Sequence, residues 1–221
     1  YGHQTLRNRV ALAPMAGMTD VPFRTLAWRF GAGHMVSEMV TSKPELWDTG
    51  KSRARRVLIS EVRPQAVQIA GHDPATMAES ARRLTGEGVE WVDLNFGCPA
   101  PKVTKTCAGA AMMAEPDNLV SMVERCMGAS TVPISVKMRL GTSQNDLTVI
   151  EIAERCAELG VLRICVHGRT LAQKYRGVAD WDLIRKVVEI TEPYGVPVIA
   201  NGDIVDASSA ASCLEVTGAS G

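Results

Sequence analysis

The chain has 221 residues, of which 46% are hydrophobic, and its 24 basic side chains balance its 24 acidic ones. This length and composition allow one domain with a substantial core, and the balanced charge gives no sign of a general attraction to nucleic acid or anionic membranes. We find no signal peptide and no apolar run near the roughly 18 residues that span a membrane, so we expect a cytoplasmic protein with no membrane partner. The chain starts at Tyr1 and its last predicted element is unfinished at Gly221, which predicts a fragment of a longer protein.

The six cysteines do not indicate a metal site or a disulfide framework. They form no Cys-x-x-Cys pair, and no group of His and Cys residues has the spacing of a zinc site, so we expect no bound metal. Cys126, Cys156 and Cys213 fall on apolar positions of predicted helices. We interpret these three as small core residues of a protein in a reducing compartment.

Short apolar segments with the composition of buried strands alternate with helical patterns. The predicted strands are residues 10–14, 34–37, 65–69, 91–95, 134–138, 163–167 and 197–201. The predicted helices start near residues 21, 74 and 180 or cover residues 119–126, 147–159 and 207–217. The basic run 51–56 is either a solvated helix face or part of an anion-binding edge.

This alternation is typical of a parallel sheet covered by helices, because the strands are too apolar to face water on either side. It predicts an α/β fold, a (β/α)8 TIM barrel that lacks its eighth strand. A doubly wound sheet is the competing fold. It usually carries a Gly-x-Gly-x-x-Gly motif after its first strand, and that motif does not occur in the sequence.

The stretch 91–99, Trp-Val-Asp-Leu-Asn-Phe-Gly-Cys-Pro, is the most informative part of the chain. Its period-two alternation predicts a strand with Asp93 and Asn95 on one face. The glycine and the proline stop that strand and hold Cys98 in a tight turn at its carboxyl end. Barrel enzymes do their chemistry at that end, so we favour a functional Cys98 over a buried structural thiol.

Other predicted strands also end in polar side chains on the face that would point into a barrel. These residues are Gln68, Asp93, Asn95, Lys137, Arg139, Cys165, His167 and Asn201. Together they would bring amides, cations and an imidazole to one rim. Such a rim suits a flat, partly anionic ligand rich in carbonyls and ring nitrogens, such as flavin mononucleotide (FMN). A sugar phosphate is the alternative ligand.

Longer motifs run in a fixed order along the chain. They are APMAGMTDVPFR at 13–24, DLNFGCP at 93–99, KVTK at 102–105, VKMR at 136–139, VHGRT at 166–170 with Gln173, Tyr175 and Gly177 after it, ADW at 179–181 and NGD at 201–203. In these motifs the chain resembles the tRNA-dihydrouridine synthases, and most closely their bacterial B-type branch.

The resemblance implies that residues 1–221 are the FMN-binding TIM-barrel catalytic domain of an oxidoreductase, incomplete at its C-terminus. Such an enzyme uses NADPH to reduce particular uridines in the D-loop of tRNA to 5,6-dihydrouridine, and we expect it to be a monomer. The family's Gly-Arg phosphate-binding signature in the eighth unit and its C-terminal helical domain, which holds tRNA, would both lie beyond Gly221.

The resemblance also implies roles for single residues. Cys98 matches the catalytic cysteine. The residues that would bind FMN are Pro14, Met15, Ala16, Gln68, Lys137, His167, Asn201, Gly202 and Asp203. Those that would meet the substrate nucleotide and nearby RNA are Asn95, Lys105 and Arg139. Cys107 has no counterpart that we expect in this family.

Reduction of the C5–C6 bond of uracil delivers a hydride to C6 and requires a proton at C5. A thiol with an ordinary pKa of about 8.5 is mostly protonated at neutral pH, so Cys98 can be that acid. One alternative is an FMN oxidoreductase like dihydroorotate dehydrogenase, against which the basic run 102–105 argues. The other is a non-catalytic RNA-binding relative, against which Cys98, Lys137 and His167 argue.

Overall fold

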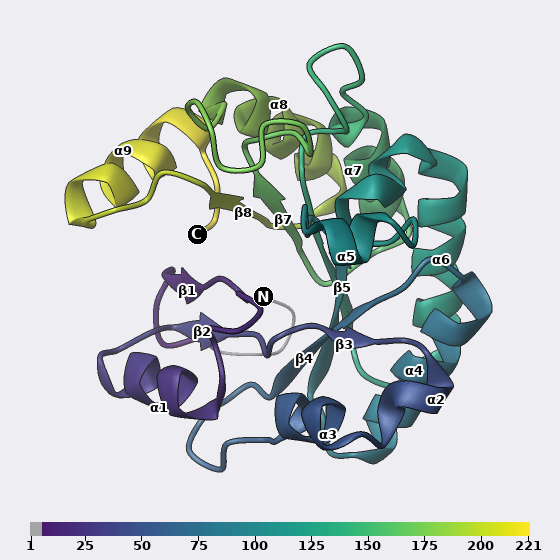
Figure 1. The fold of residues 1–221 in the computed structure, drawn as a ribbon. Helices are drawn as coiled ribbons and strands as arrows, with labels where there is room; N and C mark the ends of the chain where they lie inside the picture. Colours follow the sequence, from purple (N-terminus) through teal and green to yellow (C-terminus); the bar gives the residue numbers. More distant parts are fainter. Residues whose placement is uncertain (1–5) are drawn as a thin grey trace.

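The computed structural model describes residues 6–221 as a ring of parallel strands with helices outside it (Figure 1). The strands are β1 (Ala11–Leu12), β2 (His34–Met35), β3 (Val40–Thr41), β4 (Ala66–Ala70), β5 (Trp91–Phe96), β6 (Ile134–Met138), β7 (Ile164–His167) and β8 (Val198–Asn201). Strands β3 to β8 form one sheet in sequential order, and β1 pairs with β2. Every strand pairing is parallel, so all carboxyl ends lie at the same rim.

The helices follow the strands in turn. They are α1 (Val21–Arg29), α2 (Pro44–Trp47), α3 (Gly50–Arg56), α4 (Pro74–Gly86), α5 (Pro101–Thr104), α6 (Pro116–Ala129), α7 (Val149–Glu158), α8 (Trp181–Thr191) and α9 (Ala207–Thr217), with 3-10 helices η1 (Gly109–Ala114) and η2 (Glu192–Tyr194). Four long helices begin at aspartate caps that accept a backbone N–H three residues on: Asp20, Asp73, Asp180 and Asp206. Each cap satisfies a helix donor that has no partner within the helix.

The main apolar core lies between the sheet and its helices. Val92, Leu94 and Phe96 on β5 belong to it and are fully buried, together with apolar residues of α4, α6, α7 and α8. The other face of β5 carries Asp93 and Asn95 into the ring, as the alternation predicts. This strand therefore presents polar side chains to the ring and apolar side chains to the helices.

The strand pairing around the ring is irregular at two places, beside β4 and beside β8. An isolated bridge joins Val36 to Ala66, so β2 and β3 occupy one position in the ring beside β4. The two residues of β3 were not predicted as a strand. At the other end, the Ser220 amide donates to the Val198 carbonyl, and the Gly221 carbonyl accepts from the Ala200 amide at 2.9 Å. Residues 220–221 thus begin the strand position that follows β8 in the ring. The ring is open between this position and β1 (Figure 1).

The predicted α/β barrel is confirmed, and the helix predicted at 147–159 is α7. The basic run 51–56 is helix α3, and two of its arginines make ion pairs: Arg55 with Glu38 and Arg56 with Glu87. These two arginines hold the fold, which favours the structural interpretation for this part of the run. Among residues 6–221 we find no helix with the length and apolarity needed to cross a membrane.

Candidate active site

Cys98 lies in the turn directly after β5, where two neighbours fix its backbone. The Asn95 side-chain oxygen accepts hydrogen bonds from the Gly97 and Cys98 amides, at 3.2 and 2.9 Å. On the other side, the Cys98 carbonyl accepts from the Ala110 amide at 3.0 Å. The thiol is half-buried, so it is held in place and still open to a ligand at the rim.

Gly109, the first residue of η1, allows this close approach. Its φ of 63° lies in the left-handed region, and a Cβ there would come within 2.7 Å of the Cys98 carbonyl oxygen. Glycine is the residue that fits such a position, since it has no Cβ. Sequence reasoning did not select Gly109, because nothing in its local pattern shows that η1 folds back onto Cys98.

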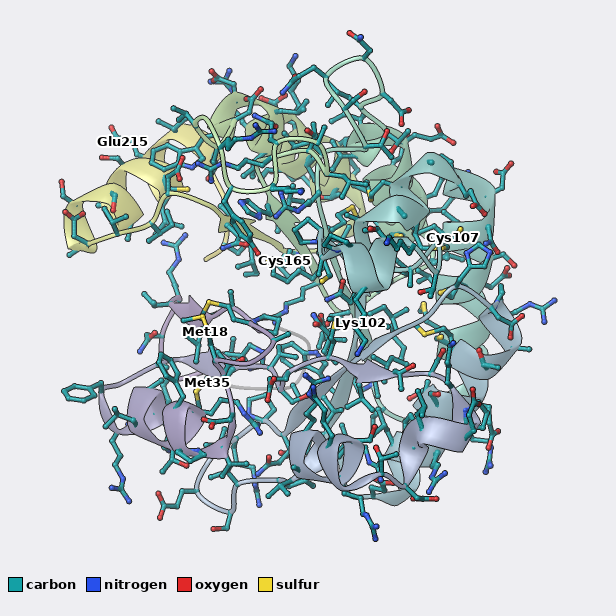
Figure 2. All side chains as sticks on the ribbon, in the orientation of Figure 1. Met18, Met35, Lys102, Cys107, Cys165 and Glu215 are labelled. Carbon is teal, nitrogen blue, oxygen red and sulfur yellow. The ribbon has the colours of Figure 1, made fainter. Side chains whose placement is uncertain are left out.

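Lys137 and Asn201 meet at the centre of the ring. The Lys137 ammonium donates to the Asn201 side-chain oxygen at 2.8 Å, across 64 positions of sequence. Both line a pocket of about 40 Å³ together with Pro14, Asp93 and Cys165. Figure 2 shows Cys165 near the middle of the molecule, as expected for a residue inside the ring.

Met15 and Ala16 lie in the loop after β1, which is closed by its own hydrogen bonds. The Met15 amide donates to the Thr19 hydroxyl at 2.9 Å, and the Met15 carbonyl accepts from the amides of Met18 and Thr19. The next amide, that of Gly17, donates to Glu38 at 2.6 Å. This loop therefore presents a fixed backbone beside Pro14 at the pocket.

His167 ends β7 directly beside Asn201 of β8, its partner in the sheet register. Burial lowers the pKa of His167 to about 3, helped by the positive charges of Lys137, Arg139 and Arg169. The imidazole is therefore neutral at physiological pH. It can exchange hydrogen bonds with a ligand but cannot serve as a cationic acid there.

The turn after β8 is tied to the loop 168–180. Gly202 has a φ of 115°, and a Cβ there would lie 2.9 Å from the His167 ring. Asp203 accepts from the Ala179 amide and from the Arg169 guanidinium, both at 2.7 Å. The Ala179 hydrogen bond, together with Arg169, lowers the pKa of Asp203. Arg169, which was not singled out from the sequence, thus joins this loop to the turn after β8.

Arg139 is buried, although the resemblance implies a contact with RNA. Its guanidinium donates to the carbonyls of Gly97, Thr170 and Lys174, at 2.7 to 3.0 Å. It joins the Cys98 turn to the loop 168–180, and its role toward the substrate stays a prediction. Lys105, by contrast, is exposed at the end of α5.

Cys107 lies outside this cluster. It is exposed, with a φ of 55°, and its carbonyl oxygen lies 3.2 Å from a His72 ring nitrogen. Figure 2 places it near the periphery of the molecule. Within the described residues 6–221, no three His, Cys, Asp or Glu side chains are grouped so that they could hold a metal ion.

The carboxyl ends of the parallel strands carry a thiol, an ammonium group, amides and a neutral imidazole. This arrangement is typical of a (β/α)8 barrel enzyme. The family model "Dihydrouridine synthase (Dus)" matches residues 11–221. The chain belongs to the dihydrouridine synthase family.

The curated relatives agree with this membership. The chain is 44% identical over 218 residues to tRNA-dihydrouridine synthase B of Escherichia coli (strain K12), and the match covers 99% of this chain and 67% of the relative. It is also 44% identical over 215 residues to a probable tRNA-dihydrouridine synthase of Rhizobium leguminosarum bv. phaseoli, with 97% and 67% covered. The chain thus spans about two thirds of the length of these relatives.

Solved structures share the fold at low sequence identity. Histamine dehydrogenase from Rhizobium sp. 4-9 superposes with a TM-score of 0.65 and 13% identity, over 96% of this chain and 42% of that chain. Mandelate oxidase gives a TM-score of 0.55 and 17% identity, over 94% and 63%. At these identities the likeness concerns the barrel alone.

Proposed function

We propose that residues 1–221 are the catalytic barrel of an enzyme that reduces particular uridines in the D-loop of tRNA to 5,6-dihydrouridine. FMN would be its resident cofactor and NADPH its reductant, and the enzyme would act as a cytoplasmic monomer. Family membership and the relatives' names support the reaction. The observation that carries the chemistry is Cys98, held half-buried at the rim between Asn95 and Gly109.

The polar groups around the pocket fit a flavin. Lys137 supplies a cation, Gln68 and Asn201 supply amides, His167 supplies a neutral ring, and the loop at 14–16 supplies backbone groups. These are the partners that a ring edge with carbonyls and nitrogens needs. The turn Asn201-Gly202-Asp203 would lie against the ribityl chain. Bound there, FMN would supply the hydride for C6 of the uracil.

Cys98 would complete the reduction by protonation. Its S–H bond breaks, a C–H bond forms at C5, and the thiolate left behind takes its proton back from solvent. His167 is a poor candidate for this step because its imidazole is neutral. Among these groups Cys98 is the donor that the geometry supports best.

The substrate would reach this site as a single base turned out of the RNA stack, which costs a few kcal/mol. Exposed groups near the rim fit contacts with the surrounding RNA. Tyr175 in the loop 168–180 is 74% exposed, and Lys102 and Lys105 are exposed on and after α5. Aromatic faces stack on bases and lysines attract the phosphates of a nucleic-acid backbone, whereas a free pyrimidine such as dihydroorotate has no flanking bases and no phosphates.

The test is Cys98→Ala in the holoenzyme. We expect NADPH oxidation by the flavin to continue while dihydrouridine formation on tRNA falls by about 10²–10⁴, the usual contribution of a general acid. Cys107→Ala is the matched control and should keep the wild-type rate. Dihydrouridine formation by Cys98→Ala within a few-fold of wild type would refute the role of Cys98, and turnover of free dihydroorotate would favour the alternative enzyme.

A further inference from the structure

Asp93 lies at the middle of β5 and accepts hydrogen bonds from both neighbouring strands. The Gln68 side-chain nitrogen on β4 donates to one carboxyl oxygen at 2.7 Å, and the Ser135 hydroxyl on β6 donates to the other. The three residues are direct partners in the sheet register, and each is 1% exposed or less. Their contacts are therefore built into the barrel wall.

The chain of hydrogen bonds continues from Gln68 to the Cys98 turn. The Gln68 oxygen accepts from the Asn95 side-chain nitrogen at 2.7 Å, and the Asn95 oxygen accepts from the amides of Gly97 and Cys98. Each amide side chain thus donates toward Asp93 and accepts from the side of Cys98. We call the series Asp93–Gln68–Asn95 the amide relay.

The direction of the amide relay follows from the chemistry of its first member. An ionised carboxylate only accepts hydrogen bonds, so Gln68 must turn its NH₂ group toward Asp93. The Gln68 oxygen then faces Asn95, which must turn its own NH₂ group toward Gln68. That leaves the Asn95 oxygen for the Cys98 amide. A buried amide in the reverse orientation would face donor with donor, which costs about 1–3 kcal/mol per unsatisfied group.

The contacts of Asp93, and not its pKa, indicate the ionised form. Burial raises the pKa of Asp93 overall, although Arg163, the hydrogen bonds from Ser135 and Gln68, and Lys137 act in the opposite direction. Both carboxyl oxygens accept a hydrogen bond, which is the pattern of the ionised form.

We propose that Asp93 is a positioning residue, which sets the orientation of Gln68 and Asn95 and through them the place of the Cys98 thiol. Only the statement that this thiol is the proton donor rests on the proposed function. The same orientation decides which atoms of Gln68 remain for a ligand. Asp93 acts on Cys98 through these two amides, since the hydrogen bonds described for its carboxylate go to Gln68 and Ser135.

The test exchanges carboxylate and amide with little change in side-chain volume. Asp93→Asn leaves one oxygen for two donors, the Gln68 NH₂ group and the Ser135 hydroxyl. Ser135 already accepts from the Trp91 indole at 2.8 Å and directs its proton to position 93, so the asparagine oxygen faces Ser135. Its NH₂ group then faces that of Gln68, and the amide relay reverses or breaks. The double variant Asp93→Asn with Gln68→Glu restores it, since the carboxylate introduced at position 68 accepts from position 93 and from Asn95. The readout is the alkylation rate of Cys98 by iodoacetamide in the holoenzyme without tRNA, followed by peptide mass spectrometry. Cys107, exposed in the same chain, is the internal reference.

We expect Asp93→Asn to speed alkylation of Cys98 relative to Cys107 by about five-fold or more, the factor given by the loss of one typical hydrogen bond. The double variant should return to within about two-fold of wild type. Ser135→Ala is the structural control. It removes a bond to Asp93 without reversing any amide, so it should lower the melting temperature while leaving the Cys98 rate unchanged.

Two results would overturn the proposal: a wild-type Cys98 rate in Asp93→Asn, or a double variant that fails to restore the rate. If Asp93→Asn does not fold, a folded double variant with the wild-type rate supports the relay, and an unfolded one refutes it. The readout needs no catalysis, so its outcome is independent of whether Cys98→Ala loses dihydrouridine formation. In that assay, Asp93→Asn should lower kcat and leave the KM for tRNA unchanged.

Discussion

At the scale of single residues, the site is shaped by what burial does to charge. His167 is 8% exposed and lies among three cations, so its imidazole stays neutral far below its ordinary pKa. Burial also lowers the pKa of Arg139, but a guanidinium stays charged in proteins, and its N–H groups donate to three carbonyls. A neutral ring beside fixed cations therefore follows from the packing of the barrel rim.

The pKa of His167 predicts how stability depends on pH. The folded pKa of about 3 lies below the unfolded value of about 6.5, so between these values the unfolded chain binds the extra proton. The contribution of His167 is thus complete above pH 6.5 and is lost as the pH falls toward 3. Between about pH 7 and pH 5 it should lower the free energy of unfolding by about 2 kcal/mol.

The variant that tests this is His167→Gln, compared with wild type by urea unfolding at both pH values. The variant should lose about 2 kcal/mol less than wild type between about pH 7 and pH 5, whatever the substitution costs at neutral pH. The comparison is internal, because His34, whose pKa burial also lowers, is present in both proteins. Equal losses would show that folding does not lower the pKa of His167.

At the scale of elements, short irregular segments hold the turn that carries Cys98. Helix η1 comes back against Cys98 through Gly109, and the loop 168–180 is held by Arg169 and Arg139. The long helices and strands supply the frame. The position of the thiol depends on these contacts between segments that follow different strands.

Gly109→Ala should therefore damage both the fold and the site. The left-handed φ and the 2.7 Å approach of a Cβ to the Cys98 oxygen predict a loss of about 1–3 kcal/mol in the free energy of unfolding. Gly128→Ala in α6 is the control, since a Cβ added there meets no atom within 4 Å outside its own helix turn, and the variant should be stabilised by about 0.5–1 kcal/mol. Urea unfolding measures both, and a neutral Gly109→Ala would contradict the packing described for η1.

At the scale of the whole molecule, segments far apart in sequence are joined beside the open position of the ring. The Arg9 guanidinium donates to the carbonyls of Ala219 and Ser220, at 2.7 and 2.8 Å. Ser220 also pairs with β8 through a backbone hydrogen bond. Arg9 therefore connects the chain before β1 to the position that follows β8.

Arg9→Ala should lower the free energy of unfolding by about 1 kcal/mol, because two charge-assisted bonds are lost from a partly exposed site. The control is Arg82→Ala on α4, whose only described ion pair is with Glu79 on the surface, and we expect no measurable change there. Thermal unfolding of the two variants beside wild type makes the comparison. Equal melting temperatures in all three proteins would show that the Arg9 contacts add nothing to stability.

Local pattern was enough to predict much of this architecture. The period-two alternation of residues 92–96 separates the side chains that face the helices from Asp93 and Asn95, which face the ring. Aspartates before helical patterns mark true helix starts, as at Asp73 and Asp180. Both signals come from residues that are close together in the sequence, so they do not depend on how the rest of the chain packs. The motifs around Cys98 and His167 indicated the family for the same reason.

What only the tertiary structure decided is which polar groups meet, and in which orientation. Lys137 finds Asn201 across 64 positions, and Gln68 finds Asp93 across 25. The guanidinium of Arg139, for which the resemblance implies a contact with the substrate nucleotide or nearby RNA, donates to three carbonyls of the protein itself. Such pairings depend on strand register and on loops that fold back over the rim, so no local pattern encodes them. The sequence by itself determined the barrel and the thiol, and the folded chain decided how that thiol is held.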